Sequence, residues 1–559
     1  MADTGDFVER VYYGFRGVDF RGDEVNLTRS PDSLNIWKNY KKTASIETRP
    51  GMALHTAFEK GVSAIYFYRG QMLVHSGNAL YSVVGGVRTS IREGLEDKSI
   101  GFVYDDVFYI IDGKNYLKYD GETFTSIEGY VPTTYISRTP FGGGERHQDV
   151  NMLTPRRINT FYADGVSTHY YVDSRNLDET PLVVKVNDEV MNASQYTVDY
   201  EAGKVTFKTA PSKPLTDGQD NVSIEFSKTV STYREAILKC TMLQVFDNRV
   251  FVTGNPDRPN YLWHCSLNDP EYFSDLDYYQ EGMDEARITG IAAGNNSLWV
   301  FREPSEANTN VFYHVPSMDD TYGKIYPSSH STISMGCIGK AINFSDDIVF
   351  FSERGMEGKA GDINSEQMAA HRSTTIDRKL LAEEGYTSMI LEEHEGYLFV
   401  IIGNKIYLAD SRAMYANVDH NEYEWFYWEM EKDIICTEVD GGILYFGTSD
   451  GVYTLTDNEC DIESWWITPK DKFDTPHKLK TTNKKGCVVE ALGDIEVYVK
   501  TNRDTEWELA GAYTDITDYF SSRIKKKKWK DIQLKFYSTT RFSLESATLE
   551  SVVGGYIKR

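Results

Sequence analysis

Residues 63–86 read SAIYFYRGQMLVHSGNALYSVVGG, and this stretch decides the fold. Its short runs of apolar and aromatic residues are separated by the turn-forming pairs Arg69-Gly70 and Gly77-Asn78. Runs of β-branched and aromatic residues between turn formers are typical of antiparallel strands joined by tight hairpins. The stretch therefore predicts a small antiparallel sheet.

The same loose pattern occurs seven times along the chain, in residues 62–86, 98–129, 236–267, 287–315, 337–355, 386–412 and 433–457. A small twisted sheet with two apolar faces and unpaired edges is not stable alone, so copies of it are expected to pack around an axis. The sequence therefore predicts an all-β fold built on a β-propeller. It leaves open whether the propeller has six or seven blades.

Two segments depart from the repeat. Residues 132–231 contain the cleanly alternating runs PLVVKVND, SQYTVDYEAGKVTFKTAP and NVSIEFSKT, which predict an inserted β-sandwich domain. After about residue 465 the repeat stops again, and runs such as GCVVEALGDIEVYVKTN and FSLESATLESVVGGY predict a C-terminal β-sandwich. The one clear helical signal is the amphipathic stretch TTIDRKLLAEE at residues 374–384.

These patterns divide the chain into five parts. We expect an N-terminal arm that closes the ring at residues 1–52, propeller blades at 53–131 and 232–464, the inserted domain at 132–231 and the C-terminal domain at 465–559. A length of 559 residues leaves room for a propeller and one or two accessory domains.

The net charge of −25 restricts the possible partners. It argues against a protein that grips nucleic acid along its whole surface, because phosphate neutralisation by Lys and Arg supplies most of that affinity. It is compatible with a conduit whose negative lumen repels passing phosphates. The simpler interpretation, that the acidity keeps a large protein soluble, is favoured.

Cysteine usage and the N-terminal sequence indicate the compartment. The six cysteines are scattered, without C-x-x-C pairs or zinc-ligand spacing, so we expect them to be reduced and expect no metal or other cofactor. The first residues, MADTGDFVERVYYGF, lack the apolar region of a signal peptide, and no apolar run is long enough to span a bilayer. Synthesis in a cytoplasm and no stable membrane insertion are expected.

Catalytic motifs are absent from the sequence. It contains no G-x-S-x-G elbow, H-E-x-x-H helix or Walker loop, and Ser449-Asp450-Gly451 is a single imperfect copy of a sialidase-type box that a hairpin turn explains better. The histidines occur singly, as at His371, and a lone histidine in a strand is more often a packing or surface residue than a ligand. We therefore expect a protein that is not an enzyme.

Three groups of residues are candidates for contacts with a partner or with DNA. The basic run RIKKKKWK at residues 523–530 is favoured as a solvated start of a strand, although it could also dock an acidic partner or face DNA. The polar segment 357–372 is a candidate partner-binding or channel loop. The first part of the inserted domain contains Gly142-Gly143-Gly144 and then Pro155-Arg156-Arg157, and an inserted domain usually exists to contact a partner. The candidate residues are Lys525, Lys526, Lys527, Lys528, Lys530, Glu357, Lys359, Asp362, Arg156 and Arg157.

Several short motifs carry a resemblance to a known family. The arm, with SPDSLNIW at residues 30–37 and KTASIETRPGM at 42–52, resembles the opening of tail nozzle (tail tubular) proteins of short-tailed bacteriophages. The second half is similar to the packaged-DNA stabilisation protein, or tail hub, of such phages. The motifs that match in order are RITGI (287–291), WVF (299–301), GCIG (336–339), FFS (350–352), TID (375–377), LFVI (398–401), IYLAD (406–410) and KWK (528–530).

The resemblance covers most of the chain outside residues 132–231, and the order of the motifs carries it, because each motif alone is generic to propellers. It implies a virion protein of the tail that forms a hexameric ring below the portal and its adaptor. Such a head–tail connector ring retains the packaged genome, contacts passing double-stranded DNA and permits ejection. Implied partners are further copies of the chain, the portal adaptor and tail fibre, spike or needle proteins.

Two other interpretations are weighed against this one. A receptor- or glycan-binding tail propeller, with depolymerase activity in some forms, could stack sugars on Trp425, Tyr427 and Trp428. These aromatic residues alternate as a buried strand would, so core packing is favoured. The third interpretation is a cellular scaffold that binds peptides.

Overall fold

The computed structural model describes residues 7–39, 41, 45–216, 218–307, 309–320, 323–359, 369–416, 421–458 and 461–556. The chain divides into two compact units. Unit 1 contains residues 1–67, 71–91 and 331–559, and unit 2 contains residues 68–70 and 92–330. Each unit is described in turn.

Unit 1 contains four antiparallel four-stranded sheets. Three of them are formed by four consecutive strands of the chain, and the fourth combines three consecutive strands with an earlier one. The first has β6 (Val62–Tyr68), β7 (Gln71–Ser76), β8 (Ala79–Val84) and β9 (Val87–Glu93). The second has β33 (Ala341–Phe344), β34 (Asp347–Ser352), β35 (Gly355–Lys359) and β36 (Ala370–His371). The third has β37 (Ile390–His394), β38 (Tyr397–Ile402), β39 (Lys405–Ala416) and β40 (Asn421–Glu429). The fourth has β41 (Ile434–Asp440), β42 (Ile443–Thr448), β43 (Gly451–Thr456) and β5 (Gly51–Ala57).

Unit 2 contains three further sheets of this kind. They are β10 (Ile100–Tyr104), β11 (Val107–Ile111), β12 (Tyr116–Tyr119) and β13 (Phe124–Ser126); β23 (Met242–Phe246), β24 (Arg249–Thr253), β25 (Tyr261–His264) and β26 (Tyr278–Gln280); and β27 (Ile288–Gly294), β28 (Ser297–Arg302), β29 (Val311–His314) and β32 (Ser328–His330). A side hairpin, β30 (Ser317–Asp319) and β31 (Gly323–Ile325), precedes β32.

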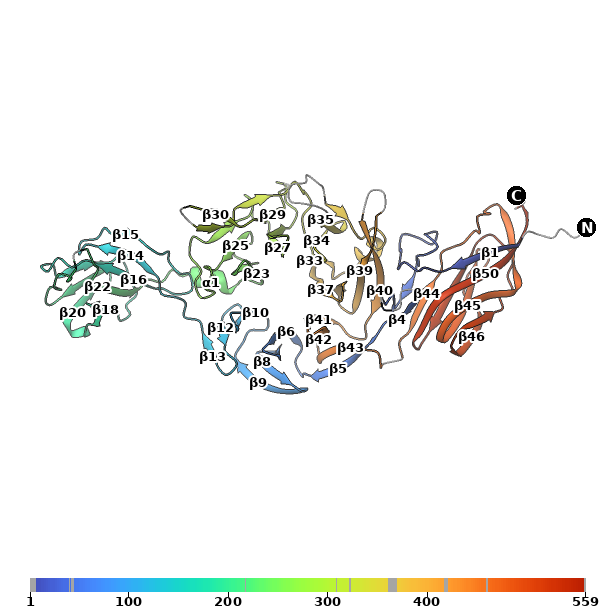
Figure 1. The fold of residues 1–559 in the computed structure, drawn as a ribbon, viewed down its shortest axis with the longest axis horizontal. Coiled ribbons are helices and arrows are strands. Elements are labelled where there is room, and N and C mark those ends of the chain that lie inside the picture. Colours follow the sequence, from blue (N-terminus) through green and yellow to red (C-terminus); the bar gives the residue numbers. More distant parts are fainter. Residues whose placement is uncertain are drawn as a thin grey trace, which may run out of the picture. The chain divides into compact units, whose positions relative to one another are not determined.

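The fold is of the β-propeller class, with four blades in unit 1 and three in unit 2, and their strands are labelled in Figure 1. The second strand of a blade is the apolar one, and all residues of β28 and β38 are buried because both faces of a blade are covered. The first strands of successive blades contact each other, β33 with β37 and β37 with β41 in unit 1, and β10 with β23 and β23 with β27 in unit 2. Each of the seven stretches with the repeat pattern forms one blade, so the described residues contain seven rather than six.

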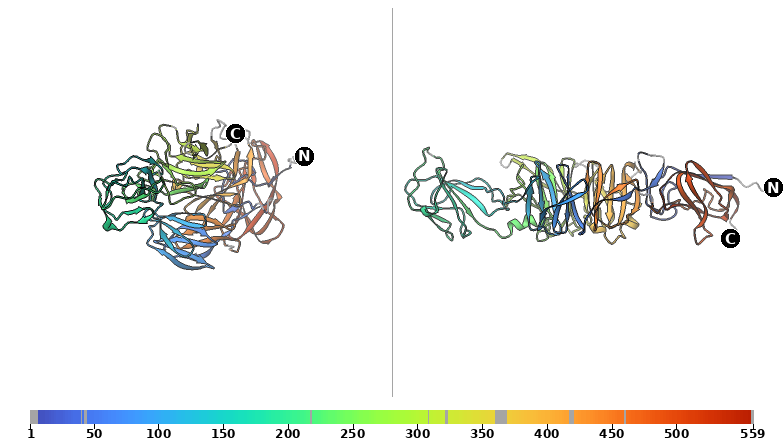
Figure 2. Two further views of the ribbon diagram at one scale, coloured as in Figure 1. Left: turned by 60° about the vertical axis from the view of Figure 1, so that its left-hand side comes forward. Right: turned by 90° about the horizontal axis from the view of Figure 1, so that it is seen from below.

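The prediction that the N-terminal arm, residues 1–52, closes the ring is wrong for most of the arm. The strand that completes a blade is β5, which pairs with β43, and it shares only Gly51 and Met52 with residues 1–52. The other strands of the arm pair with the C-terminal domain: β1 (Phe7–Tyr12) and β4 (Ile46–Thr48) pair with β50 (Phe542–Tyr556), β3 (Ile36–Trp37) pairs with β4, and β2 (Ser33–Leu34) pairs with β44 (Ser464–Ile467). Between β1 and β2 the arm packs against blade residues instead, with Val18 and Phe20 in their core. The physical reason is burial, because the apolar side chains of the arm pack into the core beside the C-terminal strands. In both views of Figure 2 the blue N-terminal strand runs along the red domain.

The C-terminal domain is a β-sandwich whose strands, with those of the arm, form one continuous hydrogen-bonded sheet of 11 strands. Besides the arm strands and β44 it contains β45 (Lys478–Thr501), β46 (Glu508–Ile516), β47 (Tyr519–Ser522), β48 (Lys527–Trp529), β49 (Ile532–Ser538) and β50. The long strand β45 pairs with β50 up to Gly493 and with β49 from Glu496 onward. The side chains of this domain pack in a core that also contains side chains of the blades β37–β40 and β41–β43.

The inserted domain in unit 2 is a second β-sandwich. One sheet contains β14 (Thr133–Arg138), β15 (Glu145–Arg146), β16 (Arg156–Phe161), β18 (Val183–Val186), β19 (Glu189–Val190) and β22 (Val222–Ser227), and the other contains β17 (His169–Tyr171), β20 (Tyr196–Asp199) and β21 (Lys204–Phe207). Their inward-facing side chains form one core, in which Phe161, Tyr170 and Phe207 make edge-to-face contacts. The short 3-10 turn η2 (Ala193–Gln195) leads into β20.

Helices are short in the part of the chain that the structure describes. α1 (Tyr233–Leu238) follows the inserted domain and was not predicted, and α2 (Asp377–Leu380), with the 3-10 turn η3 (Tyr386–Ser388) after it, occupies only part of the predicted stretch 374–384. No helix among the described residues is long and apolar enough to cross a membrane. Trp425, Tyr427 and Trp428 on β40 are buried, which confirms the prediction of core packing.

Candidate functional site

Half of the predicted contact residues lie in the basic run of the C-terminal domain, in and beside β48. Lys525, Lys527, Lys528 and Lys530 are exposed. Lys526 is different, because its ammonium group turns inward and pairs with Asp504 at 2.9 Å and Glu508 at 2.7 Å. Burial lowers the pKa of Lys526, but the hydrogen bonds to these two carboxylates outweigh it and the pKa is raised overall. The run therefore presents four exposed lysines around one structural lysine.

A second lysine-rich segment lies beside this run. Residues 478–485 of β45 read KLKTTNKK, and β45 pairs with β48 at Lys480 opposite Trp529 and Thr481 opposite Lys527. Thr482 extends the contact, since its backbone N–H donates to the carbonyl oxygen of Lys526 at 2.9 Å. Strand pairing thus places two basic segments, about 45 residues apart in sequence, side by side. We call the exposed Lys525, Lys527, Lys528 and Lys530 the basic face.

The base of this face is rigid. Lys480 is fully buried, and its ammonium group donates hydrogen bonds to the backbone carbonyls of Thr475 at 3.0 Å, Lys478 at 3.1 Å and Lys530 at 2.8 Å. Desolvation lowers the pKa of Lys480. The ammonium group also lies 5.3 Å from the centre of the buried Trp529 ring. These contacts fix the backbone on which the exposed lysines stand.

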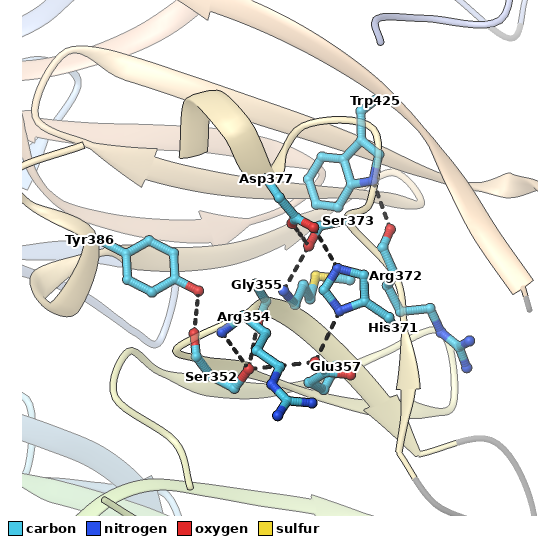
Figure 3. Close-up of polar contacts among 11 residues, drawn as sticks. Ser352, Arg354, Gly355, Glu357, His371, Arg372, Ser373, Asp377, Tyr386 and Trp425 are labelled. Atoms are coloured by element: carbon cyan, nitrogen blue, oxygen red, sulfur yellow. Dashed lines mark hydrogen bonds and ion pairs between the residues drawn. The ribbon is translucent and has the colours of Figure 1, made fainter. Parts of the chain in front are cut away.

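Glu357, the second predicted group, belongs to a polar cluster in the blade β33–β36. Its carboxylate accepts from His371 Nδ1 at 2.9 Å, and the other ring nitrogen of His371 is 2.6 Å from Asp377 Oδ2 (Figure 3). Ser373 donates to Asp377 at 2.6 Å and accepts from the backbone N–H of Met356 at 2.8 Å. The cluster therefore joins β35, β36 and the start of α2.

The electrostatics of this cluster favour a charged histidine. Burial lowers the pKa of His371, but hydrogen bonds to Asp377 and Glu357 outweigh it and raise the pKa to about 9. An imidazolium held between two carboxylates has both of its N–H groups occupied, so it is poorly placed to exchange a proton with a substrate. The arrangement is a clamp that fixes the two strands on either side of residues 360–368.

The other predicted residues near this loop and in the inserted domain are placed as follows. Asp362 lies outside the described residues, as does the side chain of Lys359. In unit 2, Arg156 forms an ion pair with Glu225 across β16 and β22. Arg157 is buried, lies over Phe226 at 5.8 Å and donates to the carbonyl oxygen of Lys228 at 3.2 Å. Both arginines therefore make contacts within their own domain.

Two carboxylates on neighbouring first strands of unit 1 also have unusual environments. Glu438 on β41 has its pKa raised to about 7, first by burial and then by the charge of Glu392 on β37. Glu392 accepts a hydrogen bond from Thr437 at 3.0 Å, and burial raises its pKa as well. No group of three or more potential metal ligands exists among the described residues.

Sequence reasoning missed the parts of these clusters that only the fold brings together. His371 was interpreted as a lone histidine, and its partners are located 14 residues before and six residues after it. Lys480 carried no signal, because a lysine in a strand is ordinarily an exposed residue. Within the described residues, no hydrogen bond or ion pair links Glu357 to the basic face, so the first two predicted groups are separate sites.

Comparison with known proteins yields structural likenesses only. No protein-family model matches the sequence, and no curated protein matches it. Among solved structures, BamB from Moraxella catarrhalis is similar with a TM-score of 0.35 and 10% identity, covering 74% of this chain and 98% of that one. YCF48 bound to D1 peptide gives a TM-score of 0.33 and 6% identity over 74% and 98% of the two chains, and the computationally designed Ika8 protein gives 0.32 and 12% over 72% and 99%. At these TM-scores the likenesses support no functional inference.

Proposed function

We propose that this chain is a structural protein of a bacteriophage tail, a nozzle or hub that assembles as a hexameric ring below the portal and its adaptor. In the assembled virion the ring would line the DNA channel, retain the packaged genome and allow its ejection. The C-terminal and inserted β-sandwiches would provide surfaces for the adaptor and for tail fibres, spikes or needles.

The observation that carries this proposal is the order of the motifs shared with tail hub proteins. They lie, in chain order, on strands of three successive blades: WVF in β28, FFS in β34, and LFVI and IYLAD in β38 and β39 of one blade. TID leads into α2, and KW of the last motif belongs to β48. The correspondence therefore extends from the blades into the C-terminal domain.

The physical properties of the chain suit such a role. Four-stranded antiparallel blades with buried central strands make a stiff body that need not deform as DNA passes. A net charge of −25 would keep phosphates from adhering to most of the surface. Heterologous contacts between neighbouring copies close a ring if the rotation between them is a whole fraction of a turn. None of these functions needs a catalytic residue.

The glycan-binding alternative loses the feature that suggested it. The aromatic rings of Trp425, Tyr427 and Trp428 are 0–1% exposed, so they are inaccessible to a sugar. Trp425 donates its ring N–H to the carbonyl oxygen of Arg372 at 2.9 Å, and Trp428 packs edge-to-face against Phe399. These contacts assign the three side chains to the blade core.

Labelling of virus particles tests the proposed function. Gold-conjugated antibodies raised against the purified chain should bind at the head–tail junction of gradient-purified particles from cells that produce this protein. Quantitative mass spectrometry of the same particles should give six copies per particle. Label at fibre tips would instead indicate a receptor-binding protein. Absence of the chain from purified particles would overturn the proposal.

A further inference from the structure

The charge of the basic face is not compensated by its surroundings. The ammonium groups of Lys525, Lys527, Lys528 and Lys530 are exposed, and none is paired with a carboxylate of any described residue. The two carboxylates nearest in the hydrogen-bonding network, Asp504 and Glu508, are occupied by Lys526. A chain with 84 acidic and 59 basic residues thus keeps four free cations within six consecutive residues.

We infer that the basic face binds the phosphate backbone of double-stranded DNA without reading its sequence. This inference rests on the C-terminal domain alone, and it holds whether or not the chain forms a ring. It assigns the exposed lysines a partner with closely spaced negative charges, since a duplex carries one charge for about every 1.7 Å of its axis.

The residue types favour phosphate over an acidic protein surface. Lysine is depleted in the cores of protein–protein interfaces, where Tyr, Trp, Met and Arg are enriched. The basic face contains lysine alone, and the one aromatic residue of the run, Trp529, is fully buried. Lysine binds phosphate as a point charge and needs no shaped interface.

The same features favour a duplex over a single strand. Proteins that bind single strands stack bases on exposed aromatic rings, and each stacked base contributes about 1–3 kcal/mol. The ring of Trp529 is covered by the Phe473 ring at 5.4 Å and by the ammonium group of Lys480, so it is not available for stacking.

The acidity of the rest of the chain does not prevent this contact. At physiological ionic strength the Debye length is about 8 Å, so distant exposed charges are largely screened and the local charge governs binding. The rigid base helps as well, because Lys480 and the pairing of β45 with β48 fix the backbone before DNA arrives. Less conformational entropy is then lost on binding.

A purely structural explanation makes a different prediction. Lysines on an edge strand prevent edge-to-edge aggregation, and β48 pairs only with β45 among the described strands. In that case removal of the lysines would promote aggregation and would leave DNA binding unchanged. The two explanations can therefore be separated with one set of variants.

The experiment measures binding of the full chain to a fluorescent mixed-sequence DNA duplex over a series of salt concentrations. Four phosphate contacts predict a slope of log K against log salt of about −3.6, which corresponds to a loss of affinity of about 100-fold between 50 and 200 mM salt. The variant Lys525→Gln/Lys527→Gln should reduce the slope to about −1.8 and should weaken binding equally for duplexes of different sequence.

A matched control removes the same charge elsewhere. Lys208 and Lys213 are exposed lysines of the inserted domain, and Lys208→Gln/Lys213→Gln should leave both slope and affinity unchanged. An equal loss in the control would show a general charge effect and overturn the inference. So would the absence of duplex binding by the wild-type chain at low salt, tighter binding of a single strand, or competition by polyglutamate as effective as that by duplex of equal charge.

Discussion

At the scale of single residues, the ionisable groups of the two clusters act mainly on stability. His371 is held between Glu357 and Asp377 and Lys526 between Asp504 and Glu508, so each cation joins two carboxylates from different segments. Removing one such cation leaves two carboxylates together without compensation. That loss costs more than the ion pair itself contributes.

His371→Ala should lower the thermal unfolding temperature of the blade that contains β35 and β36. The loss expected is about 2 kcal/mol, because the pKa of His371 is raised from an ordinary value of 6.5 to about 9 and the side chain is largely covered. A histidine with a raised pKa stabilises the folded state fully below pH 6.5, and this contribution disappears as the pH rises through 9. The difference between wild type and variant should therefore shrink between pH 6.5 and 9.

Differential scanning calorimetry at several pH values measures this effect. His147→Ala serves as the control, since His147 is exposed and its side chain makes no hydrogen bond or ion pair with a described residue. An unfolding temperature of His371→Ala equal to that of wild type at pH 6 would contradict the clamp.

Lys526→Gln should destabilise the C-terminal domain by about 1–2 kcal/mol. The neutral amide cannot form ion pairs with Asp504 and Glu508. The neighbouring Lys527→Gln changes an exposed side chain and should lie within about 0.5 kcal/mol of wild type. Urea denaturation followed by tryptophan fluorescence compares the two variants. If they were equally stable, Lys526 would be another surface lysine, as its place in the sequence run suggested.

At the scale of elements, the blades could be predicted from sequence and the partners of the arm could not. The strand pairing in a blade is local in sequence, because each strand in a stretch such as residues 63–86 pairs with the next strand of the chain. In contrast, Phe7 in β1 pairs with Val552, and no local pattern records a partner so distant in sequence. The clusters at His371 and Lys526 were missed for a different reason: their members are close in sequence, but only the folded strands and turns bring the side chains together.

The pairing of β5 with β43 can be tested at one glycine. A Cβ atom at Gly451 would lie 2.7 Å from the carbonyl oxygen of Thr56 and 3.3 Å from the Cα atom of Ala57, so Gly451→Ala should push β5 away from its blade. We expect a clear loss of thermal stability, typically of 1–3 kcal/mol for such overpacking. Hydrogen exchange of the backbone amides of β5 should also become faster.

The control is Gly61→Ala, where the added Cβ would meet atoms only at 3.6 Å and beyond. This variant should exchange at the wild-type rate. Unchanged protection of β5 in Gly451→Ala would mean that this strand does not complete the blade.

At the scale of the whole molecule, the chain combines blades with two sandwiches, and the inserted sandwich has a core of its own, whereas the core of the C-terminal sandwich also includes blade side chains. The core of the inserted domain contains only residues between Phe161 and Phe226, so its apolar side chains need no blade for burial. A fragment with residues 132–231 should therefore fold alone and unfold cooperatively. Dispersed amide signals in a proton–nitrogen NMR spectrum would confirm this, and a spectrum typical of an unfolded chain would contradict it.

The central claim is that this protein functions as a ring-forming structural subunit. Negative-stain electron microscopy of the purified, concentrated chain tests it most directly, with analytical ultracentrifugation to establish the mass. The account predicts closed rings of six copies around an open channel. Particles that remain single chains at every concentration, together with a monomer mass in the ultracentrifuge, would contradict it.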